Sequence, residues 1–221
     1  MKIFGVAAAA LVCLSRISSA GGVNLVSNAD FAGSLATWTS SFATFDGLHS
    51  ATADGTGSAL GSFTLPNNAA YGNANGLTQC IAGIVPGTTY FFGGKVLIPG
   101  NQTGTGGGSI AIQWYSSTTC TGFITNDSTP IAITPTDATD VWHFLQGNQA
   151  APGGAGSVLV IGEIQNNSGA GNAFAVNFDE IFLQTTPPVP PVSVPVIEWP
   201  ALALLAASVA AVGILRLNRS S

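Results

Sequence analysis

Short runs of apolar or alternating residues fill the middle of the 221-residue chain, separated by glycine, proline, asparagine, serine and threonine. Residues 158–161 are apolar at every position, as in a strand that is covered on both faces. Residues 110–115 alternate, as in a strand with one buried and one wetter face. Several short strands at this spacing, without helical periodicity, predict an all-β sandwich or barrel. The predicted strands are residues 59–65, 77–84, 90–98, 110–115, 141–146, 158–164 and 173–183.

The first 20 residues have the pattern of an export signal. Lys2 precedes an apolar run of about a dozen residues, and small residues follow the run up to Ala20 and Gly21. The apolar run is shorter than the ~17 residues that a membrane-spanning helix needs. Residues 1–20 are therefore predicted to be a secretory signal peptide that is cleaved between Ala20 and Gly21.

The C-terminal end has a different pattern. Residues 186–195 are rich in proline, which predicts an extended, semi-rigid spacer. Residues 196–221 contain 17 consecutive uncharged residues, followed at once by Arg216 and Arg219. A stretch of this length is at the short limit for crossing the hydrocarbon core, and the arginines favour the cytoplasmic side. The sequence thus predicts one transmembrane helix that leaves the main domain outside the cytoplasm.

Pro195, Glu198 and Trp199 stand just before the apolar span, and the two arginines follow it. This order resembles the IPTL-type C-terminal sorting domain, which occurs on exported proteins of Gram-negative bacteria. The chain departs from that pattern at Val196 and Ile197, and it lacks one residue before Glu198. The resemblance implies anchoring in the inner membrane with the domain in the periplasm. It also implies a sorting protease as a partner, and later release of the domain to the cell surface or the medium.

The charge distribution limits the partners. Charged residues make up 7% of the chain, against roughly 25% in an ordinary soluble domain. Lys95 is the only lysine or arginine between residues 17 and 215, whereas nine acidic residues lie within residues 21–186. Such a domain repels phosphate groups, which argues against a nucleic-acid partner.

Cys80 and Cys120 are the two cysteines that remain after removal of the signal peptide. An even number of cysteines in an oxidising compartment predicts a disulfide bond. A zinc site is disfavoured, because two cysteines without a nearby histidine pair do not complete a tetrahedral shell.

The order of the predicted strands within residues 21–185 resembles that of bacterial carbohydrate-binding modules. Residues 24–31 are similar to the opening strand of these modules, and Trp38 to the tryptophan that follows it. Residues 79–90 match a strand, a Pro-Gly turn and a tyrosine that enters the next strand, and residues 176–181 match the closing strand. The resemblance implies a galactose-binding-like jelly-roll β-sandwich that recognises polysaccharide.

Sugar binding needs an aromatic ring for the C–H face of a pyranose and polar groups for its hydroxyls. Gln113 and Tyr115 lie on the wetter face of their predicted strand, whereas Trp114 faces the core. Gln113 and Tyr115 are therefore the first candidates for ligand binding. Tyr115 is equally compatible with an exposed strand tyrosine that has no function.

Modules of the kind that this domain resembles commonly hold a structural calcium ion between an acidic residue of the first strand and an aspartate of the last. Asp179 matches the second position, but the first-strand position is Ala32, which leaves Asp30 one pleat away. Calcium also accepts carbonyl and water oxygens. A structural calcium held by Asp30 and Asp179 is thus implied by the resemblance, with solvated acidic loops as the alternative. No other cofactor is expected.

Few residues have the arrangement that catalysis needs. His49 and His143 share no motif, and the glycine-rich residues 104–109 lack the lysine of a phosphate loop, so we expect a mobile hairpin connection there. Asp179 and Glu180 are adjacent, so in a regular strand they point to opposite faces and do not form a glycosidase pair. No catalytic residue is assigned, and the chain is expected not to be an enzyme.

These features predict an exported, surface-associated, non-catalytic protein that recognises extracellular polysaccharide. The alternative is a structural protein of the cell surface or biofilm matrix without a specific ligand. A glycan-active enzyme is the third hypothesis.

Overall fold

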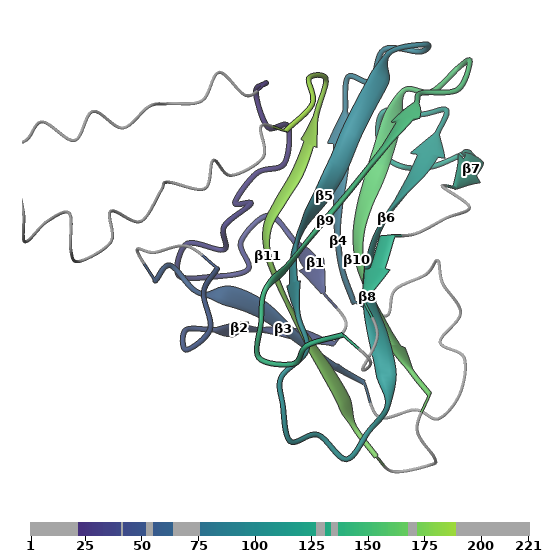
Figure 1. The fold of residues 1–221 in the computed structure, drawn as a ribbon. Helices are drawn as coiled ribbons and strands as arrows, with labels where there is room; N and C mark the ends of the chain where they lie inside the picture. The colour runs from purple at the N-terminus through teal and green to yellow at the C-terminus, as the bar shows by residue number, and fades with distance from the viewer. Residues whose placement is uncertain are drawn as a thin grey trace, which may run out of the picture. The chain divides into compact units, whose positions relative to one another are not determined.

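The computed structural model describes residues 22–40, 42–51, 55–63, 76–126, 131–133, 137–167 and 172–188. They belong to the first of two compact units, which ends at Pro188. They form two antiparallel β-sheets that pack as layers (Figure 1), and no helix occurs among them. The predicted all-β sandwich is therefore confirmed for the part of the chain that the structure describes.

Sheet A has the strand order β1-β4-β10-β6-β7, and β8 pairs with one end of β6. All of its pairings are antiparallel. Its strands are β1 (Thr39–Ser40), β4 (Gly76–Ala82), β10 (Ser157–Asn166), β6 (Gly106–Tyr115), β7 (Phe123–Asn126) and β8 (Ile131–Ile133).

Sheet B has the strand order β2-β3-β11-β5-β9, again with antiparallel pairings throughout. Its central strand is therefore β11, the last strand among the residues that the structure describes. Its strands are β2 (Ala43–Asp46), β3 (Ser58–Phe63), β11 (Phe174–Gln184), β5 (Thr89–Leu97) and β9 (His143–Ala150).

The hydrophobic core lies between the two sheets, and alternate residues of each strand fill it. On β6, the side chains of Ile110, Ile112 and Trp114 are fully buried, as the alternation predicted for Trp114. Trp114 Nε1 donates a hydrogen bond of 2.8 Å to Gln149 Oε1 on the opposite sheet, so its polar group is satisfied inside the core. Burial of each such side chain stabilises the fold by about 1.5–3 kcal/mol.

No strand forms in residues 24–31, the segment expected to be the opening strand, and residues 27–30 form a turn, so this prediction is wrong. Asn28 and Phe31 have φ angles of 49° and 48°, which interrupt an extended strand. The segment is still joined to β11, by main-chain hydrogen bonds from the Leu25 N–H to the Leu183 carbonyl at 2.8 Å and from the Ile181 N–H to the Ala29 carbonyl at 3.0 Å, and by the Asn24 side chain. Asn24 Nδ2 donates to the Ile181 carbonyl, and Asn24 Oδ1 accepts from the Leu183 N–H, each at 3.0 Å.

The glycine-rich segment is also different from the expectation. Gly106 to Ser109 are not a hairpin connection but the first residues of β6. A Cβ atom on Gly108 would lie 2.6 Å from Val176 Cγ1 and 2.9 Å from Val96 Cγ1, side chains of the opposite sheet. Glycine therefore permits close packing of the two sheets here rather than chain mobility.

The predicted disulfide bond between Cys80 and Cys120 is present, with 6.0 Å between the two Cα atoms. It links β4 to the loop between β6 and β7 across the end of β10, where the Cys120 N–H donates to Ser157 Oγ at 3.0 Å. Closing a loop of 40 residues stabilises the fold by roughly 3–4 kcal/mol on the chain-entropy model.

The predicted terminal segments fall largely outside the described residues. These include the Ala20–Gly21 cleavage site and the sorting residues Pro195, Glu198, Trp199, Arg216 and Arg219. Of the predicted spacer, the structure describes only Thr186 to Pro188. The described segments include no helix that could span a membrane.

Replacement of Gly106 by alanine tests the close packing of β6. The added methyl group would meet the main-chain carbonyl oxygen of Gln165, which cannot rotate away, so we expect a loss of about 1–3 kcal/mol in the free energy of unfolding. Gly153→Ala is the matched control, because nothing lies within 4 Å of its added methyl group. Urea unfolding of the full chain measures both variants, and equal stability would contradict the packing argument.

Candidate functional site

A β-bulge in β11 determines which side chains reach the outer face of sheet B. Asp179 pairs with Lys95 of β5, but Phe182 pairs with Gly93, so β11 has one extra residue between these pairs. Glu180 takes up the extra length with a φ angle of 47°. Ile181 thereby returns to the core, where it is fully buried.

The bulge places Asp179 and Glu180 on the same face, which corrects the expectation that they point to opposite faces. Asp179 Oδ2 accepts a hydrogen bond of 2.7 Å from the Ala51 N–H. Lys95 Nζ donates to the carbonyl of this same Ala51 at 3.3 Å and forms an ion pair of 2.8 Å with Glu180 Oε2. The two adjacent acids therefore meet around one lysine and one loop residue.

Asp179 is fully buried, and its burial is the main cause of a perturbed pKa. Desolvation of the carboxylate raises the pKa of Asp179 to about 6. Hydrogen bonds from the N–H groups of Ala51 and Glu180 lower this pKa, the Glu180 carboxylate raises it and Lys95 lowers it, but burial outweighs them. A large fraction of Asp179 is thus protonated in mildly acidic solution.

A second polar network on this face holds the loop that follows β2. Asp46 Oδ2 contacts His49 Nδ1 at 2.7 Å and accepts from Asn177 Nδ2 at 2.9 Å. Burial by itself would raise the pKa of Asp46, but hydrogen bonds from the Leu48 N–H, His49 and Asn177 outweigh it and hold this pKa below its usual value. Asn177 also donates to Ser58 Oγ at 2.9 Å, so β2, β3 and β11 are joined through its carboxamide.

Two phenylalanines stack beside these polar groups. The rings of Phe144 on β9 and Phe182 on β11 lie 5.8 Å apart with an interplanar angle of 17°. We call this pair the phenylalanine stack. Phe144 is 43% exposed, whereas Phe182 is nearly buried, so the stack presents one ring to solvent. Gly93 of β5, opposite Phe182, places no side chain between the two strands.

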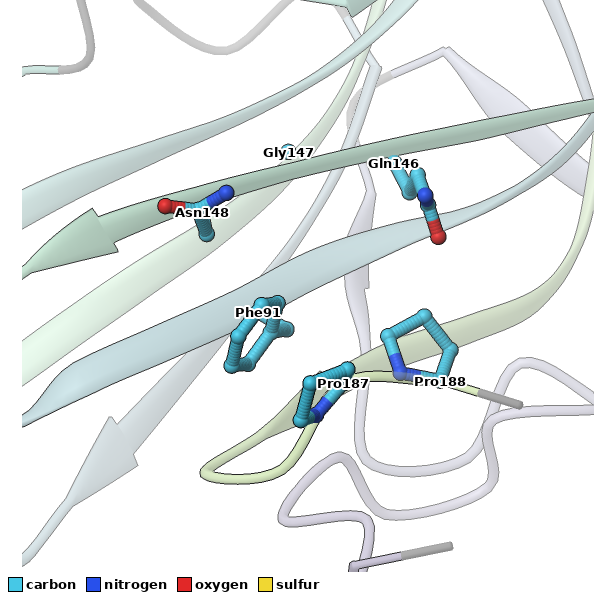
Figure 2. A pocket seen from close by; sticks show the side chains of 6 residues that line it. All are labelled: Phe91, Gln146, Gly147, Asn148, Pro187 and Pro188. Carbon is cyan, nitrogen blue, oxygen red and sulfur yellow. The ribbon is translucent and has the colours of Figure 1, made fainter. Parts of the chain in front are cut away.

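A small hollow lies further along the same face of β9. Its volume is about 110 Å³, and we call it the amide hollow. Gln146 and Asn148 follow Phe144 at intervals of two residues, so all three side chains are on one face of the strand. Figure 2 shows the Phe91 ring between Asn148 and Pro187. The hollow is lined by Phe91, Gln146, Gly147, Asn148, Pro187 and Pro188.

The candidates Gln113 and Tyr115 lie together on the outer face of sheet A. The Tyr115 hydroxyl donates a hydrogen bond of 2.8 Å to Gln113 Oε1, and the Tyr115 ring meets Phe123 edge to face at 5.9 Å. Gln113 is only 6% exposed, which leaves little of its carboxamide for a ligand. Their role in ligand binding remains a prediction, with less favourable geometry than the face of sheet B.

The implied calcium ligands do not form a ready site. Both oxygens of Asp179 accept main-chain hydrogen bonds, from Ala51 and from Glu180, and its raised pKa disfavours the charged form that calcium needs. Among the described residues there is no group of three or more histidine, cysteine or acidic side chains that could hold a metal ion. As arranged, Asp179 is a poor calcium ligand, and a site with Asp30 remains a prediction from the resemblance.

No model of a protein family matches the sequence. No curated protein matches it either.

Solved structures show a similar fold. The tandem CBM22-1–CBM22-2 domain of Paenibacillus barcinonensis Xyn10C gives a TM-score of 0.53 at 13% identity, over 78% of this chain and 49% of that chain. The single CBM22-1 xylan-binding domain of the same protein gives 0.51 at 14% identity, over 76% and 97%. The enzymatically active domain of bacteriophage CBA120 tailspike protein 4 gives 0.48 at 16% identity, over 74% and 21%.

These likenesses are informative about architecture. At such identities the two CBM22 structures show that this chain shares the fold of a carbohydrate-binding module, an antiparallel β-sandwich, and nothing more. The chain spans about half of the tandem domain and about a fifth of the tailspike domain. At a TM-score of 0.48, the tailspike domain adds nothing to the description of this fold.

Asp179→Asn tests the electrostatics of the bulge. Because burial raises the pKa of Asp179, its protonated form contributes stability that is full below pH ~4 and is lost as the pH rises through about 6. An amide cannot ionise, so Asp179→Asn does not lose this stability. The free energy of unfolding of the wild type should therefore fall relative to that of Asp179→Asn as the pH rises from 4 to 7. Urea unfolding at several pH values measures this difference. A difference that is constant over this range would contradict the raised pKa.

Proposed function

We propose that this domain recognises an extracellular polysaccharide, without catalysis, on the outer face of sheet B. The observation that carries the proposal is the alignment of an exposed aromatic ring with two carboxamides along one strand face, Phe144, Gln146 and Asn148. An aromatic ring suits the C–H face of a pyranose, and carboxamides suit its hydroxyl groups.

The charges on this face support a neutral ligand. Lys95 is the only lysine or arginine among the described residues, and its ammonium group is held by Glu180 and the Ala51 carbonyl. No described lysine or arginine is therefore available to neutralise phosphate or carboxylate groups of a ligand. This supports recognition of a neutral polysaccharide rather than nucleic acid or an acidic polymer.

The arrangement of the acids supports a non-catalytic role. Hydrolysis of a glycosidic bond needs two carboxyl groups that flank the bond. Asp179 and Glu180 share a face, but Asp179 is fully buried and Glu180 is paired with Lys95. Neither carboxyl group is presented to a substrate in this arrangement.

The setting of the domain belongs to the same proposal. The predicted signal peptide, proline-rich spacer and C-terminal span would export the domain and hold it at the inner membrane. A sorting protease would then release it to the surface or the medium. A structural matrix protein without a specific ligand remains the alternative, and the low charge of the domain suits either function.

Phe144→Ala tests the proposed site. Loss of one stacking ring should weaken the binding of a polysaccharide about tenfold, the equivalent of ~1.4 kcal/mol. Affinity electrophoresis of the full chain on a panel of polysaccharides measures this loss. Phe123→Ala is the matched control, because Phe123 is also an exposed aromatic residue but lies on sheet A.

Two results would contradict the proposal. If Phe144→Ala binds like the wild type while the Gln113→Ala/Tyr115→Ala variant loses binding, the site is on sheet A. If the wild-type chain binds no polysaccharide of the panel, the structural alternative is favoured.

A further inference from the structure

We infer that the amide hollow binds an acetyl group, so that the ligand is a neutral polysaccharide with acetyl substituents. This inference rests on the proposed function, because it assigns the backbone of the polysaccharide to the phenylalanine stack. It is carried by the size, the composition and the charge of the hollow, each of which argues against a different class of substituent.

The size of the hollow favours a small substituent over a whole sugar ring. Its volume of about 110 Å³ is well below the 300–1,000 Å³ of ordinary small-molecule pockets. The hollow therefore suits a substituent of a few non-hydrogen atoms. An acetamido group has four non-hydrogen atoms, and an acetyl ester has the same number when its bridging oxygen is included.

The lining matches both parts of an acetyl group. The Phe91 ring and the Pro187 and Pro188 rings provide apolar surface for the methyl group (Figure 2). Gln146 and Asn148 are exposed, and within the described part of the chain their carboxamides have no hydrogen-bond partner. They are therefore available to donate to the acetyl carbonyl and, for an acetamide, to accept from its N–H.

The absence of charge from the lining excludes ionic substituents. All six lining residues are uncharged. Lys95 lies on the same face of β5 as Phe91, with Gly93 between them, and its ammonium group is paired with Glu180. A uronate or a sulfate would therefore lack a cationic partner in the hollow. An ammonium group of a deacetylated amino sugar would likewise meet no carboxylate in the hollow. A bare hydroxyl group would leave the Phe91 and proline surface uncovered.

One wall of the hollow comes from the start of the predicted spacer. The ring of proline fixes φ near −65°, so a Pro187–Pro188 wall loses little conformational freedom when a ligand binds. The carboxamides lie on β9, a strand whose register with β5 is regular from Thr89–Ala150 to Val96–His143. The hollow thus has one wall on a regular strand pair and the other on residues whose φ angles are restricted.

Matched oligosaccharides test the inference on the full chain. Chitohexaose and cellohexaose have the same backbone and differ at C2, where an acetamido group replaces a hydroxyl. Acetylated xylan and the same xylan after alkaline deacetylation form the second pair, which distinguishes an ester from an amide. We expect calorimetry to show at least tenfold tighter binding of the acetylated member of one pair.

Variants separate the hollow from the stack. The Gln146→Ala/Asn148→Ala variant should bring the ratio of the two affinities close to one, because it weakens the acetylated ligand far more than the unacetylated one. Phe144→Ala should weaken both members of the pair and leave their ratio unchanged. Thr44→Ala, at the opposite edge of sheet B, is the control and should change neither.

The failures are distinguishable. Equal affinities within both pairs, with loss of both in Phe144→Ala, would overturn the acetyl inference and leave the proposed function in place. The inference would also be overturned if the Gln146→Ala/Asn148→Ala variant still preferred the acetylated ligand by the same ratio as the wild type. Failure of the wild-type chain to bind any of the four ligands would overturn the inference, and failure across the wider panel would overturn the proposed function.

Discussion

The bulge in β11 is the constraint on which the candidate site depends. Up to Phe178 the even-numbered residues of β11 face the core, and a regular strand would continue by burying Glu180 and Phe182. The extra residue reverses this order, so Ile181 becomes a core residue and Phe182 reaches the outer face. Gly94 makes the bulge sterically acceptable, since a Cβ atom there would lie 3.0 Å from Ile181 Cα.

The polar groups around the bulge join the strands and the adjoining loop of this face to one another. Lys95 joins β5 to Glu180 and to the loop at Ala51, and Asn177 joins three strands. These contacts pair Lys95, the only lysine or arginine among the described residues. The exposed side chains along β9 that we propose for a ligand are uncharged. Rigid support of a few exposed groups is what a binding site on a sheet requires.

The sequence predicts the sandwich, the disulfide and seven strands because these depend on local alternation and on cysteine number. The sequence does not predict the site, because the bulge changes which residues of β11 face outward. The bulge falls next to the apolar run Ile181-Phe182-Leu183, where the sequence does not show that Phe182 reaches the outer face. A signal was nevertheless present: Phe144, Gln146 and Asn148 alternate with the core residue Leu145. The same alternation predicts Gln113 as a candidate, but alternation indicates only which face a side chain is on and not how exposed that side chain is.

The central claim is that sheet B, and not sheet A, presents the binding face. The most direct measurement follows the amide chemical shifts of the full chain during titration with an oligosaccharide that the chain binds. If sheet B binds the ligand, the largest shifts occur in β9 and in the facing residues of β5, around Phe91, Phe144 and Asn148. Shifts centred on Gln113 and Tyr115, with β9 unchanged, would contradict the claim.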